Sequence, residues 1–337
     1  MNIAILTHPL GANYGVILQA YALTTVFRQK KHDVFVLRRD HCMPYTKRIL
    51  KQLMILLHHP RYNNPKYKNL RQFVATKITE SPILYTSVEM TEYIRKNKID
   101  YVVVGSDQVW RSDFAMGYGF NYFLDFVPDN VKRASYAASF GLSKWGYTKE
   151  QSQRIKELLK KFTSVSVREY DGQKLCKDFL GHDVDVVLDP TMLLSQKHYE
   201  EITSSRLVED NYIYIYWLGG EKEKNEILKQ FEGKRIVDIS LRHGEPLCSI
   251  GDWLSYIRYA DIVITDSFHG CVFSMLFHRQ FVMHVNMSGG FGRIESLYKL
   301  FGLEYKLTDI YQDVDYNLFE GRLEKWRKYS INYIDSL

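Results

Sequence analysis

The sequence predicts an α/β protein built from two doubly wound, Rossmann-like domains. The chain has 337 residues, which exceeds one ordinary domain, since domains average about 100–200 residues. Short apolar segments typical of buried strands alternate along it with segments of helical spacing. This alternation favours parallel sheets with helices on both faces. Ligands of such domains bind at the carboxyl ends of the strands, so we expect a site in the cleft between the domains.

The first series of elements is expected within residues 1–195, as an N-terminal Rossmann-like domain. It starts with a strand at Asn2–Thr7, a helix at Gly15–Lys30 and a strand at Asp33–Arg38. After a basic segment, the remaining elements are strands at Lys98–Asp107 and Val131–Gly141, a helix at Thr148–Phe162, and a strand, helix and strand at "TSVSVRE", "YDGQKLCKDFLG" and "VDVVLDP".

A polar stretch between residues 195 and 210 separates this series from a second one at 205–315, the expected C-terminal Rossmann-like domain. The second series alternates in the same way. Its strands are expected at "YIYIYWLG", "KRIVDIS", "ADIVITDS" and "QFVMHVN". A final helix is expected at 316–337.

Composition indicates a globular cytoplasmic protein, with 45% hydrophobic and 25% charged residues. No basic, apolar leader opens the chain, and no apolar run reaches the roughly 18 residues that span a bilayer. The four cysteines are widely spaced without a CxxC pair, so we interpret them as reduced thiols. No metal site and no cofactor are expected from these spacings.

The positive charge is concentrated between residues 28 and 71, which hold twelve Lys or Arg and two acids. Within it, residues 46–59 combine an apolar stripe at helical spacing with basic residues at one end. Such a helix can lie on an anionic membrane surface, or it can be an ordinary domain helix with a solvated basic face. No stacking-aromatic platform accompanies the segment, so nucleic-acid binding is not expected.

Polar residues follow two strands of the first series. Asn13 and Tyr14 lie in the loop after the first strand, where free N–H groups at a helix start favour an anion or a sugar hydroxyl. Ser106 and Asp107 end another strand, and Trp110 follows them. These five residues are candidate acceptor contacts. The alternatives are a tight turn, a helix cap and a core tryptophan.

Arg168 ends the strand "SVSVRE", where a planar guanidinium suits a carboxylate or phosphate, or pairs with an acid at the surface. The segment "ITDSFHG" carries the strongest signal. Asp266 ends its strand, Ser267 can cap the next helix, and His269 lies in the first helical turn, where an anion would favour its protonation.

Two further residues are candidate contacts for an anion bound near His269. Gly270 lets a ligand approach the backbone of the first helical turn. Arg293 follows the glycine-rich stretch "NMSGGFG" and can bring a cation to the cleft, although a plain loop before a helix explains the pattern equally well.

Taken together and in order, these segments resemble the polysaccharide pyruvyl transferase family. The matching motifs are "NYGVILQAYAL", "VVGSDQVW", "SYAASFG", "SVREYDG", "VLDPTMLL", "ITDSFHGCVFSMLF", "RQFV" and "GRIESLYKLFGL". The resemblance implies a GT-B-like arrangement of the two domains, with the last helix folding back towards the first domain. It also implies transfer of pyruvate from phosphoenolpyruvate to hydroxyls of a sugar in a surface polysaccharide or its lipid-linked precursor.

On this basis, His269 is expected to act as acid or base with Asp266 orienting it. Arg168, Ser267, Gly270 and Arg293 are expected to bind the donor. Two alternatives stay open. A nucleotide-sugar glycosyltransferase of the same plan would use carboxylates such as Glu245 and Asp252, and a non-catalytic glycan-binding protein would lack the His or the Arg.

Overall fold

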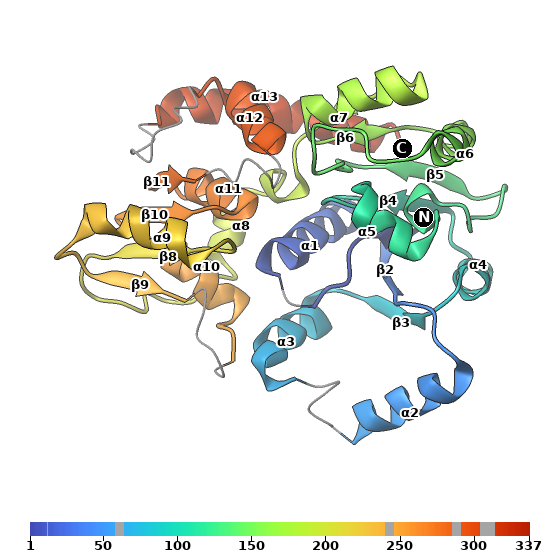
Figure 1. Cartoon of the computed structure of the whole chain (residues 1–337), viewed down its shortest axis with the longest axis horizontal. Helices are drawn as coiled ribbons and strands as arrows, with labels where there is room; N and C mark the ends of the chain where they lie inside the picture. Colours follow the sequence, from blue (N-terminus) through green and yellow to red (C-terminus); the bar gives the residue numbers. More distant parts are fainter. Residues whose placement is uncertain (12, 58–63, 240–245, 285–290, 304–313) are drawn as a thin grey trace.

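The computed structural model describes residues 1–11, 13–57, 64–239, 246–284, 291–303 and 314–337. Within these residues the chain forms two main parallel sheets (Figure 1). The first has the strand order β3-β2-β1-β4-β5 and the second β11-β10-β8-β9. A small parallel pair, β6-β7, continues the first domain. The predicted fold class is therefore confirmed.

The bounds of the elements follow from these sheets and their connecting helices. The strands and helices of the first domain are β1 (Asn2–Leu6), α1 (Tyr14–Gln29), β2 (Asp33–Arg39), α2 (Tyr45–Leu56), α3 (Lys68–Lys77), β3 (Glu80–Leu84), α4 (Ser87–Lys96), β4 (Tyr101–Val104), α5 (Ser112–Ala115), β5 (Lys132–Ser135), α6 (Lys149–Leu159), β6 (Ser166–Val167), α7 (Tyr170–Leu175) and β7 (Asp185–Val186). Those that follow are α8 (Gln196–Glu200), β8 (Ile213–Tyr216), α9 (Glu221–Leu228), β9 (Ile236–Asp238), α10 (Ile250–Arg258), β10 (Ile262–Thr265), α11 (Phe268–Leu276), β11 (Gln280–Met283), α12 (Phe291–Phe301) and α13 (Tyr316–Asp335).

The central strands are apolar and fully buried, as expected for parallel strands covered on both faces. All four residues of β4, β8 and β10 are buried. Side-chain caps start several of the helices between them. Asn13 caps α1, and capping boxes open α6 at Thr148 and α10 at Ser249.

Two sequence expectations in the first domain were wrong. The strand expected at Val131–Gly141 ends at Ser135, because Ala137 takes a left-handed backbone (φ 52°) and only isolated bridges follow it. The edge strand β3 was missed, because Pro82 interrupts its pattern and proline is tolerated at a sheet edge. The helices α3 and α4 beside it were missed as well.

The two domains share one apolar core, which passes through α1. Tyr14 of α1 stacks on Trp253 of α10, with ring centroids 5.3 Å apart. The last helix, α13, lies along the top of Figure 1 and returns to the first domain. There the Tyr333 hydroxyl donates to the carbonyl of Ser135 at 3.0 Å, and the Ser330 hydroxyl accepts from the N–H of Leu188 at 2.9 Å. The end of the chain is therefore hydrogen-bonded to the first domain through α13.

The helix α2 lies apart from the sheets, at the lower edge of Figure 1. None of its residues is buried, and its apolar side chains are open to solvent. Leu50, Leu53 and Leu56 are 54%, 49% and 74% exposed. In the described parts of the chain, no helix is both long and apolar enough to cross a bilayer.

Candidate active site

A buried cluster of charges lies where three strands of the first domain end. Arg168 follows β6, and its side chain is fully buried. Its Nη1 donates to Oδ2 of Asp189, after β7, at 2.7 Å, and its Nη2 donates to Oδ1 of Asp107, after β4, at 3.0 Å. The guanidinium therefore bridges two buried carboxylates, an arrangement that compensates the cost of burying all three charges.

The second domain adds His269 to this cluster from the first turn of α11. The imidazole is buried, and its Nε2 lies 3.7 Å from Oδ2 of Asp189. That separation exceeds a hydrogen bond, and Nε2 has no hydrogen-bond partner among the described residues. This nitrogen is therefore a buried proton donor or acceptor whose hydrogen-bonding capacity is not used within the described structure.

The start of α1 makes room for the imidazole. A Cβ atom on Gly15 would lie 2.0 Å from Nδ1 of His269, which no real contact allows. Gly15 therefore brings the backbone of the first domain against a histidine of the second. The sequence motif "NYG" is explained by this packing: Asn13 accepts from the N–H of Gly15 at 2.9 Å and caps the helix.

Phe268 connects the histidine to the arginine. The Cζ atom of Arg168 lies 4.6 Å from the centre of the Phe268 ring, which is the geometry of a cation–π contact. The ring covers the apolar face of the guanidinium, while Asp107 and Asp189 bind its terminal nitrogens.

The pKa values favour the ionised forms of Asp107 and Asp189. Burial alone would raise the pKa of Asp107, but Arg168 and then His8, His269 and Arg293 lower it to about 2. Burial likewise opposes ionisation of Asp189, yet the charges of His269 and Arg168 hold its pKa well below the usual range.

Glu169 behaves in the opposite way from these two aspartates. Burial raises the pKa of this carboxyl despite the nearby charges of Arg168 and Arg293. Its Oε1 accepts from the N–H of Phe140 at 2.8 Å.

Arg293 brings a second guanidinium to the cluster from the first turn of α12. Burial, and then repulsion by Arg168, lowers the pKa of Arg293 to about 10. The negative charges of Asp107 and Glu169 oppose this decrease in the pKa. The cluster thus holds two guanidinium groups and a histidine close to three carboxyl groups. The glycine-rich residues 285–290 before this helix, and Glu245, lie outside the described residues.

Three predicted residues hold the framework of the site. Ser106 is fully buried, and its hydroxyl lies 3.2 Å from Oδ2 of Asp189. Ser267 caps α11 by accepting from the N–H of Gly270 at 3.4 Å. A Cβ on Gly270 would lie 2.3 Å from the Thr265 hydroxyl, so this glycine permits packing of the helix on its own strand. Close approach of a ligand is not needed to explain it.

Three other predicted residues have different partners from those expected. Trp110 is fully buried, donates its Nε1–H to the carbonyl of Tyr122 at 2.9 Å and stacks on Phe123, so it belongs to the core. The Tyr14 hydroxyl donates to the carbonyl of Cys248 at 3.0 Å, across the domain junction. Neither geometry leaves a ring face for a sugar.

Asp266 does not contact His269. Its carboxylate accepts from the N–H groups of Leu218 at 2.8 Å and Gly219 at 2.6 Å, and it therefore fixes the loop after β8. Burial raises the pKa of this carboxyl. The carboxylate beside His269 is Asp189, which sequence reasoning missed. The signal was present in "VVLDP", where an Asp follows a buried strand as Asp107 does.

A comparison with protein-family models gives one decisive match. The model for polysaccharide pyruvyl transferase matches residues 13–286. The chain belongs to this family. The match includes Asp107, Arg168, Asp189 and His269, whereas Arg293 and the last two helices lie beyond it. A comparison with curated protein sequences gives no significant match.

Solved structures similar to this family member share its GT-B-like fold. One is assigned as a UDP-N-acetylglucosamine 2-epimerase from Listeria monocytogenes, with a TM-score of 0.54 and 12% identity over 98% of this chain and 89% of that one. The spinosyn forosaminyltransferase has a TM-score of 0.50 and 12% identity over 99% and 95%. The UDP-GlcNAc 2-epimerase from Neisseria meningitidis bound to UDP-GlcNAc has 0.50 and 12% over 98% and 100%. At this identity the likeness concerns the fold alone.

Proposed function

We propose that this protein transfers pyruvate from phosphoenolpyruvate to two hydroxyls of a sugar in a surface polysaccharide or its lipid-linked precursor. The products are a pyruvyl ketal and inorganic phosphate. The observation that carries the proposal is the buried Nε2 of His269, which has no hydrogen-bond partner among the described residues and lies in the cluster that holds Asp189 and Arg168. Family membership supports a pyruvyl transferase. The donor and the ketal are inferred from the chemistry of the cluster.

Phosphoenolpyruvate carries a carboxylate and a phosphate, and the cluster offers cations for both. We assign one anionic group to Arg293 and the other to the first N–H groups of α11, which have no acceptor within the helix. In this proposal Arg168 is a positioning residue, because both of its terminal nitrogens already bind carboxylates. We therefore no longer assign direct binding of the donor to Arg168.

The reaction balances with one acid–base group. A proton added to C3 of the donor leaves C2 cationic, and a sugar hydroxyl attacks C2 and releases its proton. The bond between C2 and the phosphate oxygen then breaks and releases phosphate. A second hydroxyl attacks C2 to close the ketal, and its proton passes to the released phosphate. We assign the proton transfers to His269, with Asp189 stabilising its protonated form from 3.7 Å.

Of the expected acceptor contacts, Asp107 stays a proposal, whereas Asn13 caps α1 and the buried Ser106 hydroxyl donates to the carbonyl of Ala137. Trp110 and Tyr14 are left out because their side chains are committed to the core and to the domain junction. No cofactor is proposed for this chemistry.

Mass spectrometry tests the function directly. The protein is incubated with phosphoenolpyruvate and a panel of aryl glycosides and lipid-linked sugars. We expect one acceptor to gain the mass of pyruvate less one water, with release of one phosphate. If no acceptor is modified while a nucleotide sugar is consumed instead, the protein is a glycosyltransferase and the proposal fails.

The glycosyltransferase alternative has little support from the described residues. Asp252, one of its two candidate carboxylates, is the third residue of a capping box and accepts from the Ser204 hydroxyl at 2.6 Å. A non-catalytic glycan-binding protein is disfavoured because both Arg168 and His269 are present in one cluster.

We also propose that α2 places the enzyme on the inner surface of the cell membrane. Its leucines are about half exposed or more, and Lys47 beside them is exposed. Two further basic residues at this end of the helix form ion pairs within the protein, Arg48 with Glu89 and Lys51 with Asp40. The apolar stripe therefore supplies most of the proposed attraction.

Co-sedimentation with vesicles containing anionic phosphatidylglycerol checks this placement. We expect the wild-type protein to sediment at low salt and the double variant Leu53→Asp, Leu56→Asp to stay in the supernatant. Val88→Asp on α4 is the matched control, since Val88 is 66% exposed and lies outside α2. Equal sedimentation of the wild type and the double variant contradicts the proposal.

A further inference from the structure

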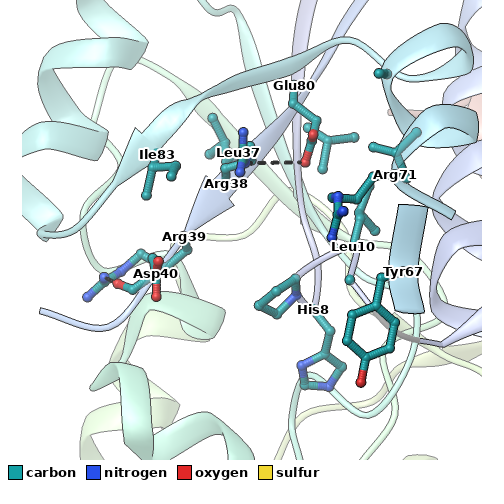
Figure 2. A pocket seen from close by; sticks show the side chains of 15 residues that line it. His8, Leu10, Leu37, Arg38, Arg39, Asp40, Tyr67, Arg71, Glu80 and Ile83 are labelled. Atoms are coloured by element: carbon teal, nitrogen blue, oxygen red, sulfur yellow. Dashed lines mark hydrogen bonds and ion pairs between the residues drawn. The ribbon is translucent and has the colours of Figure 1, made fainter. Parts of the chain in front are cut away.

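A separate cavity of about 460 Å³ opens at the carboxyl ends of β1 and β2 in the first domain. Its size is that of a small-ligand site, which is typically about 300–1,000 Å³. Figure 2 shows side chains from several elements around it, among them Glu80 and Ile83 of β3. Residues 8–11 come from the loop after β1, residues 36–40 from the end of β2, and Tyr67 and Arg71 from the start of the α3 region.

Two arginines of this cavity have hydrogen-bonding capacity to spare. Arg38 is about half exposed, and its Nε lies 3.7 Å from Oε1 of Glu80, which is an ion pair beyond hydrogen-bond length. Arg71 donates from Nη1 to the carbonyl of Asn64 at 3.0 Å. A guanidinium has five N–H donors, so both side chains can bind a further anion. They come from different elements, β2 and α3, on facing sides of the cavity.

The third arginine stabilises the wall. Arg39 is buried, and it donates from Nε to Oδ1 of Asn121 and from Nη1 to the carbonyl of Tyr85, both at 2.7 Å. Its charge still adds to the field in the cavity.

The two acids of the lining do little to cancel these charges. Asp40 is paired with Lys51 of α2 and also accepts from the N–H of His41 at 2.7 Å. Burial raises the pKa of Glu80, although Arg38 opposes this effect. The cavity is therefore electropositive on balance.

His8 connects this cavity to the active-site cluster. It lines the cavity, and its charge helps to lower the pKa of Asp107, which binds Arg168. Its Nε2 is buried with no hydrogen-bond partner in the described parts of the chain. A ligand held in the cavity would thus meet a histidine that also interacts electrostatically with Asp107.

We propose that this cavity binds the phosphate or diphosphate group of the sugar acceptor, with Arg38 and Arg71 as its ligands and the sugar directed past His8 towards His269. A phosphate presents three or more oxygens and can accept from both guanidinium groups at once, whereas a carboxylate has only two. The role as acceptor site rests on the proposed function. The binding of phosphate does not.

Calorimetric titration of the full chain with inorganic pyrophosphate tests the binding. Phosphoenolpyruvate is kept at saturation, so that the active-site cations are occupied. We expect Arg38→Ala and Arg71→Ala each to weaken the affinity at least ~10-fold, the scale of a lost hydrogen bond to a charged group. Arg95→Ala is the control, because it removes an exposed arginine of α4 that does not line this cavity. Pyrophosphate affinities equal to that of the wild type in both cavity variants overturn the proposal.

The source of the phosphate is resolved by two further titrants. Farnesyl diphosphate represents a lipid-linked sugar, and uridine diphosphate represents a nucleotide-linked one. Loss of binding of both compounds in the two cavity variants supports a shared phosphate site. The compound that the wild type binds with the higher affinity then shows whether the natural acceptor is linked to a lipid or to a nucleotide. Binding of both that is independent of the arginines counts against the site.

The transfer assay separates this inference from the proposed function. If pyrophosphate binding needs Arg38 and Arg71 but no acceptor gains pyruvate, the phosphate site is supported and the proposed function is contradicted. If transfer occurs and Arg71→Ala leaves the KM for a phosphorylated acceptor unchanged, the function stands and the cavity is not the acceptor site. A raised KM with an unchanged kcat supports both.

Discussion

Replacing His269 by alanine should lower the turnover of pyruvyl transfer at least ~100-fold, the scale of a lost acid–base group. The Nε2 of this imidazole is buried without a hydrogen-bond partner among the described residues. Asp189 lies 3.7 Å away and can stabilise the protonated form. The rate of phosphate release at saturating substrates measures this effect. Thermal unfolding of the variant shows whether the fold is retained.

The control for this substitution is His278→Ala, just after α11. That histidine is partly exposed and pairs with Glu320 at 2.8 Å, away from the cluster. We expect its turnover to stay close to the wild-type value. Near-normal transfer by His269→Ala would show that this residue is neither the acid nor the base.

A second pair of variants acts on the same histidine through packing. Gly15→Ala places a methyl group on the His269 ring and should reduce turnover by displacing it, whereas Gly11→Ala meets no atom within 4 Å and should be neutral. Equal turnover in these two variants would mean that the position of the imidazole is not critical.

Replacing Arg168 by alanine should reduce the free energy of unfolding by about 3–5 kcal/mol, as expected when one partner of a buried ion pair is removed. The loss arises because Asp107 and Asp189 would stay buried without their shared cation. Urea unfolding followed by circular dichroism measures the change. Activity should fall as well, since Asp189 would no longer be held beside His269.

Arg111→Ala provides the comparison for Arg168→Ala. Arg111 also pairs with an aspartate, but Asp113 is 53% exposed, so we expect at most about 1 kcal/mol. Arg168→Lys should recover part of the stability through its charge while failing to bind both carboxylates at once. A stability loss for Arg168→Ala no larger than for Arg111→Ala would contradict the bridging role.

The order of strands and helices was predictable because buried parallel strands are nearly all apolar and end in polar residues. The strand before His269 and its capping serine follow directly from "ADIVITDS". The strand β3 and the early end of β5 could not be predicted. A proline at a sheet edge and an alanine with a left-handed backbone depend on neighbours distant in the chain.

Within the candidate site, sequence patterns located Asp107, Arg168 and His269 but assigned the wrong carboxylate to the histidine. Asp266 adjoins His269 in the chain, yet its oxygens face the backbone after β8. Asp189 comes from a different domain and approaches the ring across the junction. Proximity in sequence was a poor guide, because the residue that ends a strand points to the neighbouring strand's loop.

The sequence by itself determined the family, the alternating α/β plan and the polar residues at the strand ends, because these depend on local periodicity and on motifs in fixed order. The tertiary structure decided which of those residues act together. Only the packing of α1 against α11 shows why Gly15 must be a glycine, and only the meeting of three strand ends gives Arg168 two carboxylates. Such pairings depend on how the two domains fit, which no local pattern encodes.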